Sequence, residues 1–377
     1  MGSIVAAMAT VHAPQLVTLP PEEDQAQLQA GIAAMRELGK VLDETNPDVL
    51  LLIGIDHLET YFLDAVPTFA LVTGERTKAA FAHTRHEVPN HQPLAKALLE
   101  GLIDAGFDLT FSENALLGHA FSTPLEYVHE GRNIPVVPLM VNVYLPPLPT
   151  PKRCADLGRA LAKVIEGRPE RVAIVASGGM SHYPGTWKYY DPEYDFDRWA
   201  IREMENGALD DLMALSGSDL DEVGNTEMLT WMVMFGAIGP QQGELLSYQP
   251  TSHHGHAVMR FLPGRSTPPP ARTEPKYGGF QFKGAGYEFY KYPPSNTYSM
   301  QKLLVDLRGS ASLRERFFED MDAVISEREG LEPEQIEAVK TLQVKPMVDL
   351  GAHPILTLTS ILVIQAHQRR LAAAADA

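Results

Sequence analysis

Four short and almost uninterrupted apolar stretches constrain the fold of this 377-residue chain more than any other feature of its sequence. They read IVAAMAT (4–10), DVLLLIGID (48–56), IPVVPLMVNV (134–143) and RVAIVAS (171–177). Such stretches are typical of strands that are buried on both faces. Between them, apolar residues recur at helical spacing over residues 28–42 and 94–103. Strands that alternate with helices predict an α/β fold, with a central, mostly parallel sheet flanked by helices.

The pattern changes in the last third of the chain. Residues 266–295 are dense in proline, glycine and aromatic residues and show neither strand nor helix periodicity. So many Tyr and Phe residues argue against a plain flexible linker, and we expect an ordered strap on the protein surface. Beyond it, apolar residues recur at helical spacing in three places: from Met300 to Leu307, from Leu313 to Met321, and after Pro333. The expected organisation is an α/β domain at 1–265, a connecting strap at 266–295 and a small all-helical domain at 296–377.

The charge balance excludes several classes of function. Lys and Arg number 31 and Asp and Glu number 48, so the formal net charge is −17. There is no compact basic run, and we expect no nucleic-acid partner, because phosphate binding needs concentrated Lys and Arg. No apolar run approaches the ~20 residues that a bilayer-spanning helix needs, and the N-terminus lacks the basic residues of a signal peptide. We therefore expect a cytoplasmic protein with no membrane partner.

The counts of histidine and cysteine narrow the possible metal sites. The chain has 13 histidines and a single cysteine, Cys154. One cysteine excludes an internal disulfide framework and any cysteine-rich zinc or iron–sulfur site. A bound metal would therefore be held by nitrogen and oxygen, which favours imidazole–carboxylate sites for iron, manganese or catalytic zinc.

Four histidines stand in similar surroundings. His12 follows IVAAMATV, His57 follows DVLLLIGID, His182 ends IVASGGMSH, and His119 lies in LLGHAFSTPL. Each alone is explained by a structural hydrogen bond, but several imidazoles that converge on one cleft are common around a metal. Three of the four follow predicted strands, whose ends carry the functional groups of α/β folds. The stretches HTRHE (83–87) and SHHGH (252–256) are polar and loop-like, and we expect them at the surface or lining the cleft.

A carboxylate stands at the start of a strongly apolar helix. Glu227 begins the stretch EMLTWMVMFGAI. Taken alone, an acidic residue in the first turn is explained by the positive end of the helix dipole.

These elements occur together in a known order. HAP, DH, GHAFSTPL, GGMSH and an acidic residue before an apolar tryptophan helix resemble the class III (LigB-type) extradiol ring-cleavage dioxygenases. Protocatechuate 4,5-dioxygenase and gallate dioxygenase are the members with the greatest likeness, which extends to VNVYLPPLPTPKRCADLG (141–158). Residues 296–365 resemble the small α subunit of protocatechuate 4,5-dioxygenase, fused here behind the catalytic part.

The resemblance implies a role for each residue. It makes His12, His57 and Glu227 the ligands of Fe(II), His182 the acid/base residue, and His119 a second catalytic histidine. Two histidines and one carboxylate leave adjacent positions open for two substrate oxygens and O2, as ferrous oxygenases require. The implied protein is an oxidoreductase that cleaves an aromatic ring, needs only Fe(II) and O2 beside its small aromatic substrate, and forms a homodimer or higher homo-oligomer.

One departure concerns the substrate. The protocatechuate enzymes hold the substrate carboxylate with a Ser-Asn pair, whereas this chain has Ser252 and His253 as candidate substrate-binding residues. A protonated histidine could bind a carboxylate, and a neutral one offers a single donor that suits a neutral ring. Protocatechuate, gallate, other catechols and 3-hydroxy-4-pyridone all stay open as substrates.

Two other readings remain. Ser181-His182 could belong to a hydrolase, although the GxSxG motif of a nucleophile elbow is missing. The chain could also be a zinc-loaded or non-catalytic relative of the same fold that acts as a binding protein.

Overall fold

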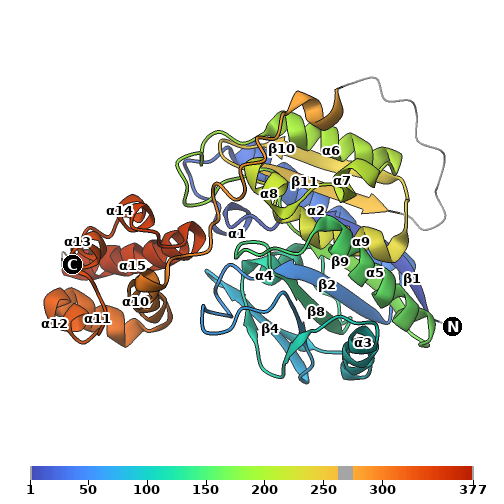
Figure 1. Ribbon diagram of the computed structural model, residues 1–377. Helices are drawn as coiled ribbons and strands as arrows, with labels where there is room; N and C mark the ends of the chain where they lie inside the picture. The colour runs from blue at the N-terminus through green and yellow to red at the C-terminus, as the bar shows by residue number, and fades with distance from the viewer. Residues whose placement is uncertain (1, 262–274, 376–377) are drawn as a thin grey trace.

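The computed structural model describes residues 2–261 and 275–375 (Figure 1). In this part of the chain the main sheet has eight strands in the order β10-β11-β1-β9-β2-β8-β3-β6. The strands are β1 (Ser3–Thr10), β2 (Val49–Ile55), β3 (Phe69–Val72), β6 (Thr110–Ser112), β8 (Val136–Val141), β9 (Arg171–Ser177), β10 (Gly243–Pro250) and β11 (Gly255–Phe261). All four apolar stretches therefore form strands, as predicted.

The centre of the sheet is parallel and its flanks are mixed. β1, β9, β2 and β8 run parallel to one another, with Ala9 beside Ala176 and Leu52 beside Val175 in the register. β11 joins β1 antiparallel and carries the hairpin strand β10 at one edge. At the other side β3 is antiparallel to β8 and parallel to β6. The predicted α/β class with a mostly parallel central sheet is confirmed.

Helices cover both faces of the sheet. α5 and α9 pack together against β1 and the strands beside it, with α3 alongside, while α2 and α4 pack on the other face. The helices of this part are α1 (Gln15–Thr18), α2 (Gln25–Thr45), α3 (Gln92–Asp104), α4 (His119–Tyr127), α5 (Pro151–Glu166), α6 (Tyr194–Asn206), α7 (Asp210–Met213), α8 (Gly217–Glu222) and α9 (Met228–Ile238). β2 is buried along its whole length, which explains why its sequence is apolar without alternation.

A small second sheet lies beside α4. It consists of β4 (Arg76–Phe81), β5 (Thr84–Pro89) and β7 (Leu116–Leu117), in the order β5-β4-β7. The HTRHE stretch was expected to be loop-like, and this is wrong for His86, which lies in β5 opposite Ala79. β4 and β5 join through a tight turn in which Ala82 has a φ of 50°.

The C-terminal region is helical, and its helices α10 to α15 lie at one end of the molecule, whereas η1 packs against α6 (Figure 1). Its elements are η1 (Lys276–Gly279), η2 (Ser295–Thr297), α10 (Tyr298–Gly309), α11 (Ala311–Glu319), α12 (Met321–Ser326), α13 (Pro333–Lys340), α14 (Val344–Asp349) and α15 (Pro354–Ala375). The expected helix from Leu313 to Met321 is wrong at its end. The backbone of Asp320 is extended, which ends α11, and its carboxylate accepts a hydrogen bond from the N–H of Ala323. Asp320 therefore caps a separate helix, α12, that begins at Met321.

The sequence pattern does not indicate α14 or α15. The described part of the predicted strap, residues 275–295, is irregular apart from η1 and η2. The predicted boundary at 265/266 lies outside the described residues, so the domain division stays a prediction. No helix among residues 2–261 and 275–375 is both long enough and apolar enough to cross a bilayer.

Candidate active site

Three neighbouring strands bring three histidines to one edge of the sheet. His12 follows β1, His182 follows β9 and His57 follows β2, and these strands are adjacent in the order β1-β9-β2. His119 joins them from the first residue of α4. His12, His57 and His119 are almost fully buried, at 1–3% exposure. The expectation that histidines gather at the carboxyl ends of the parallel strands is confirmed.

The hydrogen bonds of His12 leave one ring nitrogen free for a metal. Its Nδ1 lies 3.0 Å from Oγ of Ser177, and the Ser177 hydroxyl donates to the carbonyl of Ala120 at 2.6 Å. Because that hydroxyl has only one proton, Nδ1 of His12 must be the donor. In the neutral ring Nε2 then carries a free lone pair, and it faces Oε2 of Glu227 at 3.4 Å. Metal-binding histidines typically have such a partner, here the Ser177 hydroxyl, which bonds the ring nitrogen that does not face the metal and so orients the ring.

His57 and His119 stack on each other beside His12. The centroids of the two rings are 3.9 Å apart, and each ring meets His12 edge to face. Ligand atoms of the three residues lie within 4.8 Å of one another. Nδ1 of His57 and Nδ1 of His119 are buried without a hydrogen-bond partner. Burial and the neighbouring His119 lower the pKa of His57 to about 3, so the His57 ring is neutral at pH 7 and able to bind a cation.

Glu227 supplies a fully buried carboxylate to the same cluster. Its Oε1 lies 3.5 Å from Nε2 of His57, and its Oε2 faces His12. Burial by itself would raise the pKa of the Glu227 carboxyl, but His12 and His182 lower that pKa well below its usual range. The hydroxyl of Tyr144 donates to Oε1 at 2.7 Å, and the backbone N–H of Gly179 donates to Oε2 at 2.5 Å. An ionised carboxylate held this way supplies the negative charge that a divalent cation needs.

The two glycines of GGMSH permit this close approach. A Cβ on Gly178 would meet the carbonyl oxygen of Glu227 at 2.6 Å, so a side chain would push the start of α9 away. A Cβ on Gly179 would meet Oε2 of Glu227 at 3.0 Å and the His254 ring at 2.3 Å. The two glycines therefore let the backbone of the motif approach Glu227 closely, and a side chain at either position would prevent this approach.

His182 contacts the other side of the carboxylate. Its Nδ1 donates to the carbonyl of Met180 at 2.9 Å, and its Nε2 lies 3.4 Å from Oε1 of Glu227 and 3.2 Å from the hydroxyl of Tyr144. Burial opposes a charge on this ring, but Glu227 raises the pKa of His182 above its ordinary value. With Nδ1 fixed on a carbonyl, Nε2 is the position at which His182 gains or releases a proton.

The SHHGH stretch is buried, so the surface expectation is wrong for it. His253, His254 and His256 are 1–4% exposed. His256 lies in β11, and the His254 ring stacks on His182 with centroids 3.8 Å apart. The polar sequence misleads here because the end of the β10–β11 hairpin pairs with residues 180–182, which follow β9, and this pairing places it inside the protein.

Ser252 and His253 lie beside this stack but bind other groups. Nε2 of His253 is 2.8 Å from the amide nitrogen of Gln15, and its Nδ1 is 2.9 Å from Oγ of Ser252. The His253 ring also stacks on Tyr189. Burial, with His182 nearby, lowers the pKa of His253 to about 4, so the ring is neutral at pH 7.

Sequence reasoning did not single out two residues of this site. Tyr144 lies in VNVYLPPLPT after β8 and contacts Glu227 from 83 residues away in the chain. Glu59 follows His57 by two residues and lies 3.6 Å from Nδ1 of His119. The Asp-His-Leu-Glu spacing at the end of β2 was a usable signal for Glu59, whereas nothing local marks Tyr144.

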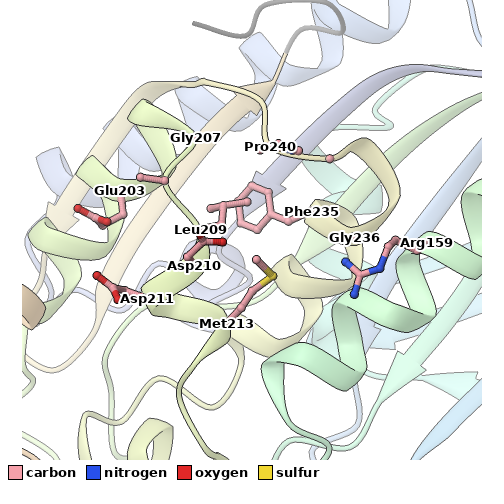
Figure 2. A pocket seen from close by; sticks show the side chains of 12 residues that line it. Arg159, Glu203, Gly207, Leu209, Asp210, Asp211, Met213, Phe235, Gly236 and Pro240 are labelled. Carbon is pink, nitrogen blue, oxygen red and sulfur yellow. The ribbon is translucent and has the colours of Figure 1, made fainter. Parts of the chain in front are cut away.

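A separate cavity of about 680 Å³ lies away from the histidines. Figure 2 shows Phe235 and Met213 pointing into it, with Arg159 on one side and acidic residues of the α6–α7 segment on the other. Its lining comes from α5, α6, α7 and the end of α9 and includes none of the candidate site residues.

The fold and the cluster define an α/β protein with a buried histidine–carboxylate site suited to a metal ion. Residues 6–261 match the family described as the catalytic LigB subunit of aromatic ring-opening dioxygenase. The match spans most of the chain, and the chain belongs to this family. It ends before the C-terminal helices, so the likeness of those helices to a small α subunit stays a prediction.

Curated relatives are similar to part of the chain. A stretch of 174 residues is 32% identical to 2,3-dihydroxyphenylpropionate/2,3-dihydroxicinnamic acid 1,2-dioxygenase of Klebsiella pneumoniae subsp. pneumoniae, and it covers 46% of this chain and 55% of that protein. The protein named 2,3-dihydroxyphenylpropionate/2,3-dihydroxicinnamic acid 1,2-dioxygenase 2 of Pseudomonas putida is 30% identical over 174 residues, which again cover 46% of this chain and 55% of that protein. The chain thus spans about half the length of these relatives. A solved structure of an uncharacterized protein from Escherichia coli K12 aligns with a TM-score of 0.48 and 15% identity over 68% of this chain and 99% of its own.

Proposed function

We propose that this protein is a non-haem Fe(II)-dependent extradiol dioxygenase that opens an aromatic ring bearing vicinal oxygens. The observation that carries the proposal is the position of the Glu227 carboxylate, which lies 3.4 Å and 3.5 Å from Nε2 of His12 and His57 in a buried site. Two neutral imidazoles and one carboxylate fit a ferrous ion that keeps open positions. The family match and the names of the relatives support the reaction class.

In this proposal His12, His57 and Glu227 hold the iron. Iron(II) in such a site supplies open positions for two substrate oxygens and O2, and a route for electrons from the ring to dioxygen. Ser177 keeps the metal-facing nitrogen of His12 unprotonated, and Gly179 and Tyr144 orient the carboxylate of Glu227. These contacts prepare the site before any substrate arrives, which lowers the cost of binding it in a reactive pose.

His182 and His119 are the proposed catalytic histidines. Nε2 of His182 faces the cluster while Nδ1 stays on Met180, so this ring is oriented to take a proton from a substrate hydroxyl and to return it during ring opening. His119 stacks on His57, and its buried Nδ1 lies 3.6 Å from the Glu59 carboxylate. The other ring nitrogen, Nε2, would donate to a substrate oxygen or to dioxygen while it carries a proton.

The contacts of His253 bear on the substrate. Its ring nitrogens already bind Gln15 and Ser252, and the neutral ring offers no positive charge for a carboxylate. This favours a substrate held mainly by its two ring oxygens, and Ser252 and His253 then line the site as polar neighbours. Candidates are 3-hydroxy-4-pyridone and catechols, with the catechol acids protocatechuate and gallate as further members of the same class.

Oxygen uptake tests the proposal. The enzyme is loaded with Fe(II) under anaerobic conditions and is then offered protocatechuate, gallate, 2,3-dihydroxyphenylpropionate, catechol and 3-hydroxy-4-pyridone in separate assays. We expect about one O2 per ring opened with at least one of them, and the absorption spectrum of the product identifies the bond cleaved. Ring cleavage that continues without oxygen would contradict the proposal.

One observation favours a second candidate, a zinc-loaded relative. His12, His57 and His119 offer three imidazoles within 4.8 Å of one another, a set that also suits zinc. Metal analysis of the purified protein separates the two, because zinc without oxygen uptake would support this reading. A serine hydrolase is less compatible with the site, since the buried Ser181 hydroxyl donates to the carbonyl of Val223. Assembly into a homodimer or higher homo-oligomer stays a prediction that light scattering tests.

A further inference from the structure

An arginine of the C-terminal helices, Arg308, reaches the backbone beside His57. Arg308 on α10 donates one N–H to the carbonyl of Leu58, the residue that follows His57 in the chain. A second nitrogen of the guanidinium donates to Oγ1 of Thr359 on α15 at 2.8 Å, which fixes the guanidinium between α15 and the Leu58 backbone. The contact joins segments that are 250 residues apart in sequence.

The turn that Arg308 contacts needs outside support. Leu58 has a φ of 57°, in the left-handed region that branched, bulky residues rarely adopt. Within the turn, the carboxylate of Asp56 accepts hydrogen bonds from the backbone N–H groups of Glu59, Thr60 and Tyr61. The carbonyl of Leu58 is bonded from outside the turn, by Arg308. Because His57 lies inside the turn, the position of its ring depends on this backbone.

A second residue of the C-terminal region reaches the other side of the site. Nε2 of His353 donates to the carbonyl of Tyr144 at 2.8 Å, because a carbonyl can only accept. His353 is 1% exposed, and its backbone N–H donates to the side chain of Gln301 on α10 at 3.0 Å. Tyr144 in turn donates its hydroxyl to Glu227. The C-terminal region thus bonds the Leu58 carbonyl beside His57 and the carbonyl of Tyr144, whose side chain bonds Glu227.

We propose that Arg308 and His353 are positioning residues through which the C-terminal helices set the affinity of the site for a divalent metal. The inference rests on the proposed metal site. Neither side chain touches the metal ligands, and each acts on a carbonyl of the segment that carries His57 or Tyr144. Loss of a hydrogen bond to a metal ligand itself typically weakens metal binding by about 10–100-fold. Arg308 and His353 act one residue farther out, so about 10-fold is the expected weakening from the loss of either contact.

The test measures metal binding directly. Dissociation constants for Fe(II) are determined anaerobically by competition with a coloured chelator, and Co(II) absorption spectra report the ligand geometry. Arg308→Met and His353→Phe remove the donors, whereas Arg308→Lys keeps the charge and His353→Gln keeps a donor. Arg316→Met is the matched control, because Arg316 lies on α11 and pairs with Glu327 where both side chains are 52% exposed.

We expect about 10-fold weaker Fe(II) binding and an altered Co(II) spectrum in Arg308→Met and His353→Phe. His353→Gln should recover most of the affinity, and Arg316→Met should match the wild type. If the wild-type protein itself binds no metal at this site, the proposed function fails. If the wild type binds and both donor-lacking variants bind equally well with an unchanged spectrum, the positioning role is wrong. Should Arg308→Met not fold, the comparison of His353→Phe with His353→Gln decides the question.

Discussion

The hydroxyl of Tyr144 donates a 2.7 Å hydrogen bond to Oε1 of Glu227. The same hydroxyl lies 3.2 Å from Nε2 of His182, so one buried tyrosine joins the proposed carboxylate ligand to the proposed acid/base histidine. Because the hydroxyl has a single proton and gives it to Glu227, it can accept a hydrogen bond from Nε2 of His182 only while that nitrogen carries a proton. The protonation of His182 and the orientation of Glu227 are thereby linked.

Replacing Tyr144 by phenylalanine tests this link. We expect Tyr144→Phe to fold and to lose about 10–100-fold in kcat, with a smaller change in KM, because the carboxylate loses one of its two orienting donors. Steady-state oxygen uptake measures both constants. The control is Tyr127→Phe, since the Tyr127 hydroxyl donates to the carbonyl of Leu16 and not to the site. Equal loss of kcat in both variants would point to general packing damage.

The ligand role of Glu227 is tested by Glu227→Gln. A carboxamide cannot supply the anionic oxygen, so we expect iron content after loading and dialysis to fall to about a tenth or less of the wild-type value. Glu170→Gln serves as the control, because Glu170 is also buried but pairs with Arg168. Full iron occupancy in Glu227→Gln would remove Glu227 from the ligand set and favour the three-histidine arrangement.

His182 is predicted to act on protons and not to hold the metal. His182→Phe should keep its iron but lose at least about 100-fold in turnover, within the range that positioned acid/base groups contribute. Metal analysis and oxygen uptake on the same sample separate the two effects. His129→Gln is the control, since the buried His129 ring bonds the carbonyl of Ile134 and not a residue of the proposed site. Unchanged turnover in His182→Phe would exclude the acid/base role.

The sequence predicts the parts of the site that depend on local pattern. His12, His57 and His182 follow strands whose apolar runs are unmistakable, and parallel strands place their carboxyl ends at one edge. Glu227 is recognisable only through the family resemblance, because an acid at a helix start has a simpler explanation. The structure brings all four residues together, with each histidine within 3.5 Å of the Glu227 carboxylate.

Other features depend on contacts between distant segments. Tyr144 and Arg308 reach their partners across 83 and 250 residues, and no local periodicity encodes such pairs. The SHHGH stretch has the composition of a surface loop, yet the hairpin of β10 and β11 buries it. α15 escapes notice because its apolar residues do not follow a single stripe: Leu362 is 53% exposed while Ile361 is 2% exposed.

A last prediction concerns pH and stability through Asp197. This buried carboxylate accepts hydrogen bonds from the backbone N–H of Ser181, the hydroxyl of Tyr248 and the amide of Asn225. Burial raises the pKa of Asp197 from 3.8 to about 7, against the lowering effect of these donors and of His182. Between about pH 4 and 7 the folded state therefore keeps a proton that the unfolded chain has lost.

The sign of the effect follows from that difference. The Asp197 contribution to the free energy of unfolding should be fully present below pH 4, fall as pH rises toward 7 by up to about 4 kcal/mol, and stay constant above. Asp197→Asn should remove this slope. Urea unfolding of metal-free protein at pH 5, 6, 7 and 8 measures it, with Asp195→Asn as the control because the Asp195 side chain is 82% exposed on the same helix. Buried histidines titrate in the same range with the opposite sign, so the quantity to compare is the difference between wild type and variant at each pH. A difference that does not change between pH 5 and 8 would show that Asp197 is already ionised in the folded protein at pH 5.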